Sequence, residues 1–276
     1  MNMRNWFVTG ASGGLGRVLT VQALARGERV TATVRRPDSL DDLVAAHRGR
    51  LTVVELDLTR PADVERVVGE AVAAGRVDVV VNNAGFVVAG AAEEMTVRDL
   101  RDQVEVLLLA PMTVTRAFLG PMREQGGGRI VQISSMGGQV AVPTHSAYHA
   151  GKWGLEGYTE SVAREMAEFG VYLTVVELGG TRTGFASAMR FTDETEPYRD
   201  SAVGRTRRGL ESLTDEALTG DPARIAAAID DLTRLPDPPL RLTLGADAYD
   251  SVHAALTERL AAMEGRRDLA ASIAFR

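Results

Sequence analysis

The chain has 276 residues, of which 45% are hydrophobic and 25% charged, with a formal net charge of −6 and a pI near 5.4. This composition is that of an ordinary folded protein with a sizeable core, and the length fits one large α/β domain over residues 1–276. An acidic chain has no general positive field for a phosphate backbone, so we expect small molecules and not nucleic acid as its partners.

The cysteine and histidine counts exclude several kinds of site. The chain has no cysteine, which removes disulfides, thiolate nucleophiles and Cys-based zinc or iron–sulfur sites. Its 4 histidines do not form an HExxH pattern, and no metal is therefore predicted. The apolar run near the N-terminus is too short for a secretory signal, and no stretch approaches ~18 apolar residues, the nearest being residues 106–112. We therefore expect a cytoplasmic protein with no membrane partner.

Short runs rich in Val and Ile alternate with longer stretches of helical periodicity, which is typical of β–α–β units. Strands are predicted at residues 6–9, 29–34, 51–55, 77–82, 129–134, 171–177 and 241–244. Helices are predicted at residues 15–26, 40–47, 61–74, 97–123, 147–169, 222–235 and 246–266. The pattern predicts a doubly wound (Rossmann) parallel sheet of seven strands in the order 3-2-1-4-5-6-7, with helices on both faces.

Residues 184–215 interrupt this alternation with a mixed stretch of aromatic and charged residues. Insertions of this length commonly serve as lids, so the segment is a candidate cover for the substrate. A solvated loop is the alternative.

A glycine-rich turn, TGASGGLG, lies between the first predicted strand and the first helix. Glycines there let backbone N–H groups and the helix N-terminus approach a pyrophosphate. Gly10, Ser12, Leu15 and Gly16 are the expected contacts, and the alternative is an ordinary strand–helix connection.

The end of the second strand carries Arg35 and Arg36 and no acidic residue. A carboxylate there would bind the 2′-hydroxyl of a dinucleotide, whereas an arginine fork suits a 2′-phosphate. This favours NADP(H) as the cofactor. The alternative is that both arginines are simply solvated.

Polar residues also follow the third and fourth strands. We expect Asp57 to accept a hydrogen bond from an adenine amino group, with Leu58 beside it. Asn83, Ala84 and Gly85, which close the fourth strand, lie at the same edge of the sheet, where ligands of open α/β folds bind. Each group could instead be turn chemistry.

Ser135, Tyr148 and Lys152 form the most informative constellation. The i, i+4 spacing places Tyr148 and Lys152 on one helical face, where a cation can stabilise a phenolate and lower its pKa. Lys152 is the only lysine among the 31 basic residues, which indicates a role that arginine does not fill. An amphipathic helix with an incidental Tyr and Lys is the weaker interpretation.

The motifs TGASGGLG, NNAG and YHAGK, with Ser135 before the last, resemble those of the short-chain dehydrogenases/reductases in their shorter, single-domain form, up to about Thr183. The resemblance implies that Tyr148 exchanges the proton at the substrate oxygen, Ser135 hydrogen-bonds that oxygen and Lys152 binds the nicotinamide ribose. It further implies cofactor contacts from Gly10, Ser12, Leu15, Asp57, Asn83 and Thr183. We expect Tyr148 to contact the cofactor as well. It also suggests a homodimer or homotetramer, to which the last helices and the tail at residues 266–276 could contribute.

Two features depart from the family, and the milder one is Leu178-Gly179 after the sixth strand, where its members usually carry Pro-Gly. Where its members usually carry an Asn that holds a proton-relay water, this chain has Leu107, and Asn83 is its last asparagine. Leu offers no side-chain hydrogen bond, although a backbone carbonyl could hold the water.

The leading hypothesis is an NADP(H)-dependent oxidoreductase that acts on the ketone or secondary alcohol of a hydrophobic small molecule. Because of Leu107, a non-redox lyase, isomerase or cyclase is the second hypothesis. A non-catalytic NADP(H)-binding regulator is the third, and it has no need of the Ser–Tyr pair.

Overall fold

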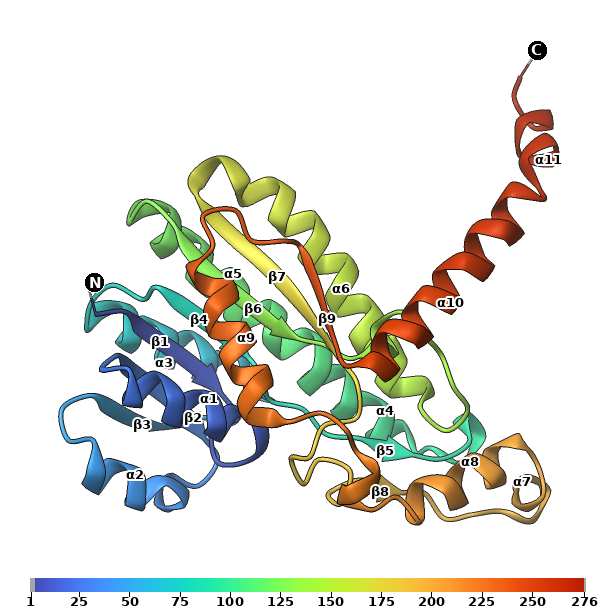
Figure 1. Ribbon diagram of the computed structural model, residues 1–276, viewed down its shortest axis with the longest axis horizontal. Helices are drawn as coiled ribbons and strands as arrows, with labels where there is room; N and C mark the ends of the chain where they lie inside the picture. The colour runs from blue at the N-terminus through green and yellow to red at the C-terminus, as the bar shows by residue number, and fades with distance from the viewer. Residues whose placement is uncertain (1–2, 276) are drawn as a thin grey trace.

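Seven parallel strands form one sheet in the computed structural model, which describes residues 3–275 and only the backbone of Asp215 (Figure 1). The strands are β1 (Asn5–Thr9), β2 (Arg29–Val34), β3 (Leu51–Glu55), β4 (Val79–Asn82), β6 (Gly128–Ile133), β7 (Val171–Leu178) and β9 (Arg241–Leu244). Their order is β3-β2-β1-β4-β6-β7-β9, with every neighbouring pair parallel. The predicted Rossmann topology is therefore confirmed.

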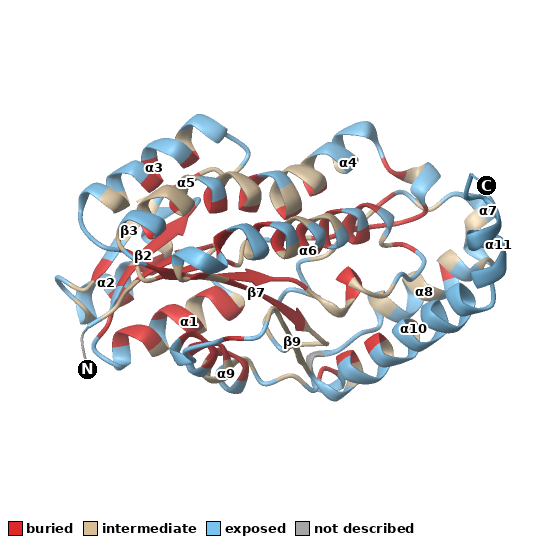
Figure 2. Cartoon of the chain, turned by 90° about the horizontal axis from the view of Figure 1, so that it is seen from above, coloured by how far each residue is buried: buried red, intermediate tan, exposed pale blue. Residues whose placement is uncertain are grey.

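Helices cover both faces of the sheet, and an apolar layer lies under each set (Figure 2). One face is covered by α1 (Gly14–Ala25), α2 (Asp41–Ala46) and α9 (Pro222–Arg234). The other is covered by α3 (Pro61–Ala73), α5 (Ala110–Glu124) and α6 (Ser146–Met166). Because strands buried on both faces need apolar side chains in both directions, they appear in the sequence as continuous Val and Ile runs.

Local signals begin and end these helices. The Asp221 carboxylate accepts a hydrogen bond from the Ala223 N–H at 2.8 Å, and Pro222 occupies the first turn of α9. Gly170 ends the helical turn Ala167–Phe169 with a φ of +69°, a conformation that glycine adopts without strain. Short 3₁₀ helices lie at Pro37–Leu40, Ala92–Glu94, Met136–Gly138, Ala167–Phe169 and Asp215–Ala217.

The predicted helix at residues 97–123 consists of three parts. A π turn, η3 (Glu105–Leu109), separates α4 (Val97–Val104) from α5. By length and apolar composition the whole stretch Val97–Glu124 would suffice to cross a membrane. This corrects the expectation that no segment approaches the requirements of a membrane span. Its inward side chains Val114, Phe118 and Met122 are fully buried against the sheet, as in the core helix of a folded domain.

Residues 184–215 are not a loop throughout, although no regular element was predicted there. They contain β8 (Arg190–Phe191), α7 (Glu196–Arg199) and α8 (Ala202–Glu211). Strand β8 pairs with β5 (Val88–Ala89) in a small second sheet. The Glu94 carboxylate accepts hydrogen bonds from the Thr195 N–H at 2.7 Å and the Thr192 hydroxyl at 3.1 Å, so this segment is tied to the body of the protein.

The last helices, α10 (Ala246–Glu264) and α11 (Arg267–Ser272), project away from the sheet (Figure 1). Beyond Val252 their residues are almost entirely exposed (Figure 2). The exposed apolar side chains there are Leu256, Leu260, Met263, Leu269, Ile273 and Phe275. Arg276, the last residue of the tail for which subunit contacts were predicted, lies outside the described residues.

Candidate active site

The glycine-rich turn connects β1 to α1 at the carboxyl edge of the sheet. Gly10 has a φ of +67°, and a Cβ there would lie 2.9 Å from the Ala84 Cα, so only glycine fits. Gly13 caps α1 without a side-chain hydrogen bond, and a Cβ on Gly14 would approach the Thr183 Cβ to 3.3 Å. The first turn of α1, whose N–H groups have no partner inside the helix, thus lies close to Thr183, and a helix N-terminus of this kind suits a pyrophosphate.

The residues after β4 brace this turn. The Asn83 side-chain amide donates hydrogen bonds to the carbonyls of Thr9 at 2.9 Å and Gly10 at 3.2 Å. The Thr9 hydroxyl accepts from the N–H groups of Asn83 at 3.0 Å and Ala84 at 3.2 Å. A Cβ on Gly16 would overlap the Asn83 amide. The NNAG motif therefore has a structural contact with the turn, and the two motifs lie together as predicted.

Other residues expected to contact a cofactor differ in what they can offer. Ser12 is exposed beside the turn, whereas the Leu15 side chain is buried in the core and leaves only its backbone N–H for a ligand. Leu58 is partly buried against the core under α3 and α5. A Cβ on Gly85 would lie 3.2 Å from the Leu107 side chain, so Gly85 borders the apolar part of the site.

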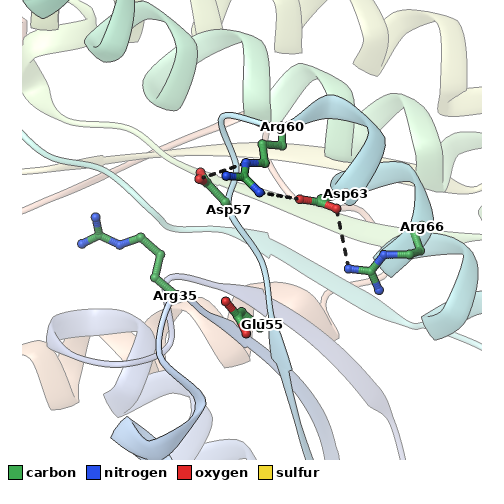
Figure 3. A pocket seen from close by; sticks show the side chains of 6 residues that line it. All are labelled: Arg35, Glu55, Asp57, Arg60, Asp63 and Arg66. Atoms are coloured by element: carbon green, nitrogen blue, oxygen red, sulfur yellow. Dashed lines mark ion pairs between the residues drawn. The ribbon is translucent and has the colours of Figure 1, made fainter.

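A charged pocket lies beyond the ends of β2 and β3 (Figure 3). It is lined by Arg35, Glu55, Asp57, Arg60, Asp63 and Arg66. Arg35 belongs to this pocket, whereas Arg36 is not among its lining residues. Arg60 and Arg66 were not singled out from the sequence, although Arg60 follows Asp57 by three positions and forms an ion pair with it at 3.7 Å.

The Asp57 carboxylate is already engaged in its own turn. It accepts hydrogen bonds from the Thr59 hydroxyl at 2.8 Å and the Thr59 N–H at 3.0 Å. These hydrogen bonds, with the charge of Arg60, lower the pKa of Asp57. Asp57 is therefore ionised at neutral pH and held by Thr59 and Arg60. The predicted hydrogen bond from adenine to Asp57 did not take these contacts into account.

Three elements bring Ser135, Tyr148 and Lys152 together. Ser135 follows β6 and caps the Met136–Gly138 turn, where its hydroxyl accepts from the Gly137 N–H at 3.1 Å. Tyr148 and Lys152 are buried on α6. The Lys152 ammonium donates to the Ile133 carbonyl at 2.7 Å and lies 5.8 Å from the centre of the Tyr148 ring.

Burial dominates the electrostatics of this site. It raises the pKa of Tyr148 to about 12, which the nearby Ser135 hydroxyl partly opposes. The expectation that Lys152 brings this pKa below its ordinary value is therefore wrong for this structure. Burial also lowers the pKa of Lys152 to about 8, against the opposing charge of Glu156. At neutral pH Tyr148 thus holds its proton beside a charged lysine, which suits a proton donor.

Leu107 lies in the π turn and is 1% exposed. It belongs to an apolar cluster with Val87, Ala89 and Tyr148. Side chains of the 184–215 segment pack against this cluster, namely Met189, Phe191 and Leu210. The Phe185 ring lies 6.4 Å from that of Tyr148. Part of the surroundings of Tyr148 is therefore apolar, and the candidate cover contributes to that part.

Among the described side chains, which are those of residues 3–214 and 216–275, no group of three or more His, Asp or Glu is arranged to hold a metal ion.

A family model described as short chain dehydrogenase matches residues 4–194. "Oxidoreductase BOA17" of Botryotinia fuckeliana is 38% identical over 248 residues, 89% of this chain and 90% of that protein. A "3-ketodihydrosphingosine reductase" of Bacteroides thetaiotaomicron is 30% identical over 86% of each chain. The crystal structure of a short-chain dehydrogenase from Streptomyces avermitilis is similar, with 40% sequence identity and a TM-score of 0.92. The match covers 99% of this chain and 100% of that one. The chain belongs to the short-chain dehydrogenase/reductase family of oxidoreductases.

Proposed function

We propose that the protein is an NADP(H)-dependent reductase of a ketone on a hydrophobic small molecule, or in reverse a secondary-alcohol dehydrogenase. The observation that carries this proposal is the buried Tyr148, which has Ser135 and Lys152 beside it and an apolar cluster against its ring. Such a site excludes water, holds one proton for transfer and offers a hydroxyl to orient the acceptor oxygen.

The residues of this chain divide the chemistry. Bound nicotinamide would supply or accept a hydride at the carbonyl carbon. The Tyr148 hydroxyl donates its proton to the carbonyl oxygen as the alcohol forms, and the Ser135 hydroxyl donates a hydrogen bond to the same oxygen. Lys152 presents an ammonium next to Tyr148 for the ribose hydroxyls. The first turn of α1 and Thr183 would hold the pyrophosphate, and Arg35 would hold the 2′-phosphate.

The direct test is to incubate the protein with NADPH and each of a panel of apolar ketones and to follow the absorbance of NADPH. We expect NADPH to be consumed with equimolar alcohol formed. If no ketone causes NADPH to be consumed, and the protein converts a substrate without any change in the cofactor, the proposal is contradicted. That result supports a lyase, isomerase or cyclase instead. Tight NADPH binding without conversion of any substrate supports a regulator.

Cofactor preference depends on Arg35. We expect NADPH to bind more tightly than NADH, and Arg35→Ala to weaken NADPH by about 1.5 to 3 kcal/mol, the range for a charged hydrogen-bond partner, while NADH changes little. Fluorescence titration gives both dissociation constants. Arg36→Ala is the matched control, because Arg36 lies outside the pocket lining and should matter less. Equal affinities of the parent for the two cofactors would contradict the preference.

Leu107 predicts slow proton exchange at Tyr148. Loss of a positioned proton-transfer group costs roughly 10² to 10⁴ in rate, so we expect a low kcat with a marked solvent isotope effect. Leu107→Asn should raise kcat if its amide finds partners at this buried position. Leu107→Ala, which opens the same space without a hydrogen-bonding group, should not. If Leu107→Asn folds, binds NADPH and shows no gain on any ketone reduced by the parent, the relay explanation is wrong.

Self-association and a cytoplasmic location are further parts of the proposal. The exposed apolar side chains of α10 and α11 support self-association, because a helix of this kind is stable in water mainly when a partner covers its apolar face. Sedimentation of the purified chain measures its molar mass in solution and so tests self-association.

A further inference from the structure

A buried carboxylate lies directly behind the candidate site. Glu156 is on α6, one turn after Lys152, and is 1% exposed. One of its oxygens accepts from the Ser134 hydroxyl at 2.7 Å, and the other accepts from the Gln139 amide and the Arg241 guanidinium. A Cβ on Gly138 would overlap this carboxylate, so the turn after β6 has room for it only because residue 138 is glycine.

The contacts of Glu156 extend to two more strands. Arg241, on β9, also donates to Glu177 of β7 at 3.1 Å and to Glu160 of α6 at 3.3 Å. The Thr243 hydroxyl donates to Glu177 at 2.6 Å. The polar groups facing Glu156 are thus Lys152, Glu160, Ser134, Gln139, Glu177 and Arg241.

A contribution to the stability of the fold does not readily explain why these charged residues are buried together. Removing charges from water costs several kcal/mol per ion, and apolar residues of similar volume often serve as well or better. Its position is more informative. Ser134 is bonded in sequence to Ser135, and Glu156 shares a helical face with Lys152 and lies two turns after Tyr148.

We propose that Glu156 is a positioning residue, whose buried carboxylate holds the strand end that carries Ser135 against the helix that carries Tyr148 and Lys152. Through Arg241 it fixes the same helix to β9. Glu156 also lies one turn from Lys152 on the same face of α6, where the charge of its ionised form favours the protonated lysine, against the burial that lowers the lysine's pKa. Burial raises the pKa of Glu156 itself, which the Ser134 and Gln139 hydrogen bonds and the charge of Arg241 oppose. The kinetic consequences of this inference rest on the proposed function, whereas the effect on Lys152 does not.

The single lysine allows a test that needs neither substrate nor cofactor. Lysine labelled at Cε with an NMR-active carbon isotope gives one side-chain signal, from Lys152, whose pH titration is read directly. We expect the parent to titrate near pH 8 and Glu156→Gln to titrate lower, by on the order of 1 pH unit, because an opposing negative charge is lost. In Glu156→Gln, Arg241 still has hydrogen bonds to Glu177 and Glu160, and glutamine has nearly the same shape as glutamate, so this variant should fold.

Two variants serve as comparisons. Glu160→Gln removes a carboxylate that binds the same Arg241 from a partly exposed position, and its Lys152 should titrate as in the parent. Ser134→Ala removes the hydrogen bond to Glu156 without changing any charge, so it should leave the lysine titration unchanged. In ketone reduction, Glu156→Gln and Ser134→Ala should lower kcat by roughly 10- to 100-fold, through misplacement of the reacting groups, with KM little changed.

The outcomes separate this inference from the proposed function. A lower Lys152 midpoint in Glu156→Gln alone, with kcat lowered in Glu156→Gln and Ser134→Ala, supports the positioning role. If the parent reduces no ketone, a shift of the Lys152 titration midpoint confined to Glu156→Gln still supports the electrostatic effect of Glu156 on Lys152, and the proposed function fails by itself. If Glu156→Gln keeps the parent's midpoint and kcat and loses only thermal stability, Glu156 is merely structural and the inference is overturned.

Discussion

Tyr148→Phe is expected to abolish carbonyl reduction while NADPH affinity stays nearly unchanged. Only the phenolic oxygen is lost, and the ring can keep its place in the apolar cluster with Leu107 and Val87. Without the Tyr148 hydroxyl the proposed proton donor is lost, and general acid catalysis alone is worth roughly 10² to 10⁴ in rate. Steady-state reduction of a ketone and fluorescence titration of NADPH measure the two effects.

Tyr158→Phe is the matched control. It removes a phenolic hydroxyl from the same helix, where the Tyr158 hydroxyl donates to the Met112 carbonyl at 3.4 Å, away from Ser135 and Lys152. This variant should reduce ketones at nearly the parent's rate. A Tyr148→Phe variant that retains a tenth or more of the parent's kcat would remove Tyr148 from the proposed mechanism.

Lys152→Arg is expected to fail as well, although the positive charge is kept. The ammonium occupies a buried position with the Ile133 carbonyl at 2.7 Å, and the larger planar guanidinium cannot take the same place beside Tyr148. We expect both weaker NADPH binding and a loss of kcat of at least about 10²-fold, the cost of misplacing groups near the reacting atoms.

The pH dependence of the parent gives a second measurement of the lysine's role. A group whose pKa is lowered to about 8 is charged below that pH and neutral above it, so cofactor affinity and kcat should both fall as the pH rises past about 8. Arg164→Lys is the control for exchanging cations, because Arg164 lies on the exposed face of the same helix with 78% side-chain exposure. If Lys152→Arg keeps most of the parent's activity, the argument from the single lysine is wrong.

Several parts of the fold were predictable from the sequence because they depend on local patterns. The inner strands β4, β6 and β7 are buried on both faces, and short apolar runs locate every strand of the main sheet to within about two residues. The short pair β5 and β8 was not predicted, since two-residue strands have no periodicity and form only when Val88 and Arg190 meet in space. The π turn that divides residues 97–124 was also not visible in the pattern.

The candidate site divides in the same way. The spacing of Tyr148 and Lys152 determined by itself that they share a helical face, because one turn of helix relates positions i and i+4. Only the tertiary structure decided their protonation, because burial by distant segments raises the pKa of Tyr148 and lowers that of Lys152. Glu156 and Arg241, 85 positions apart, could be paired only by the fold, since the approach of β9 to α6 leaves no pattern in the neighbourhood of either residue.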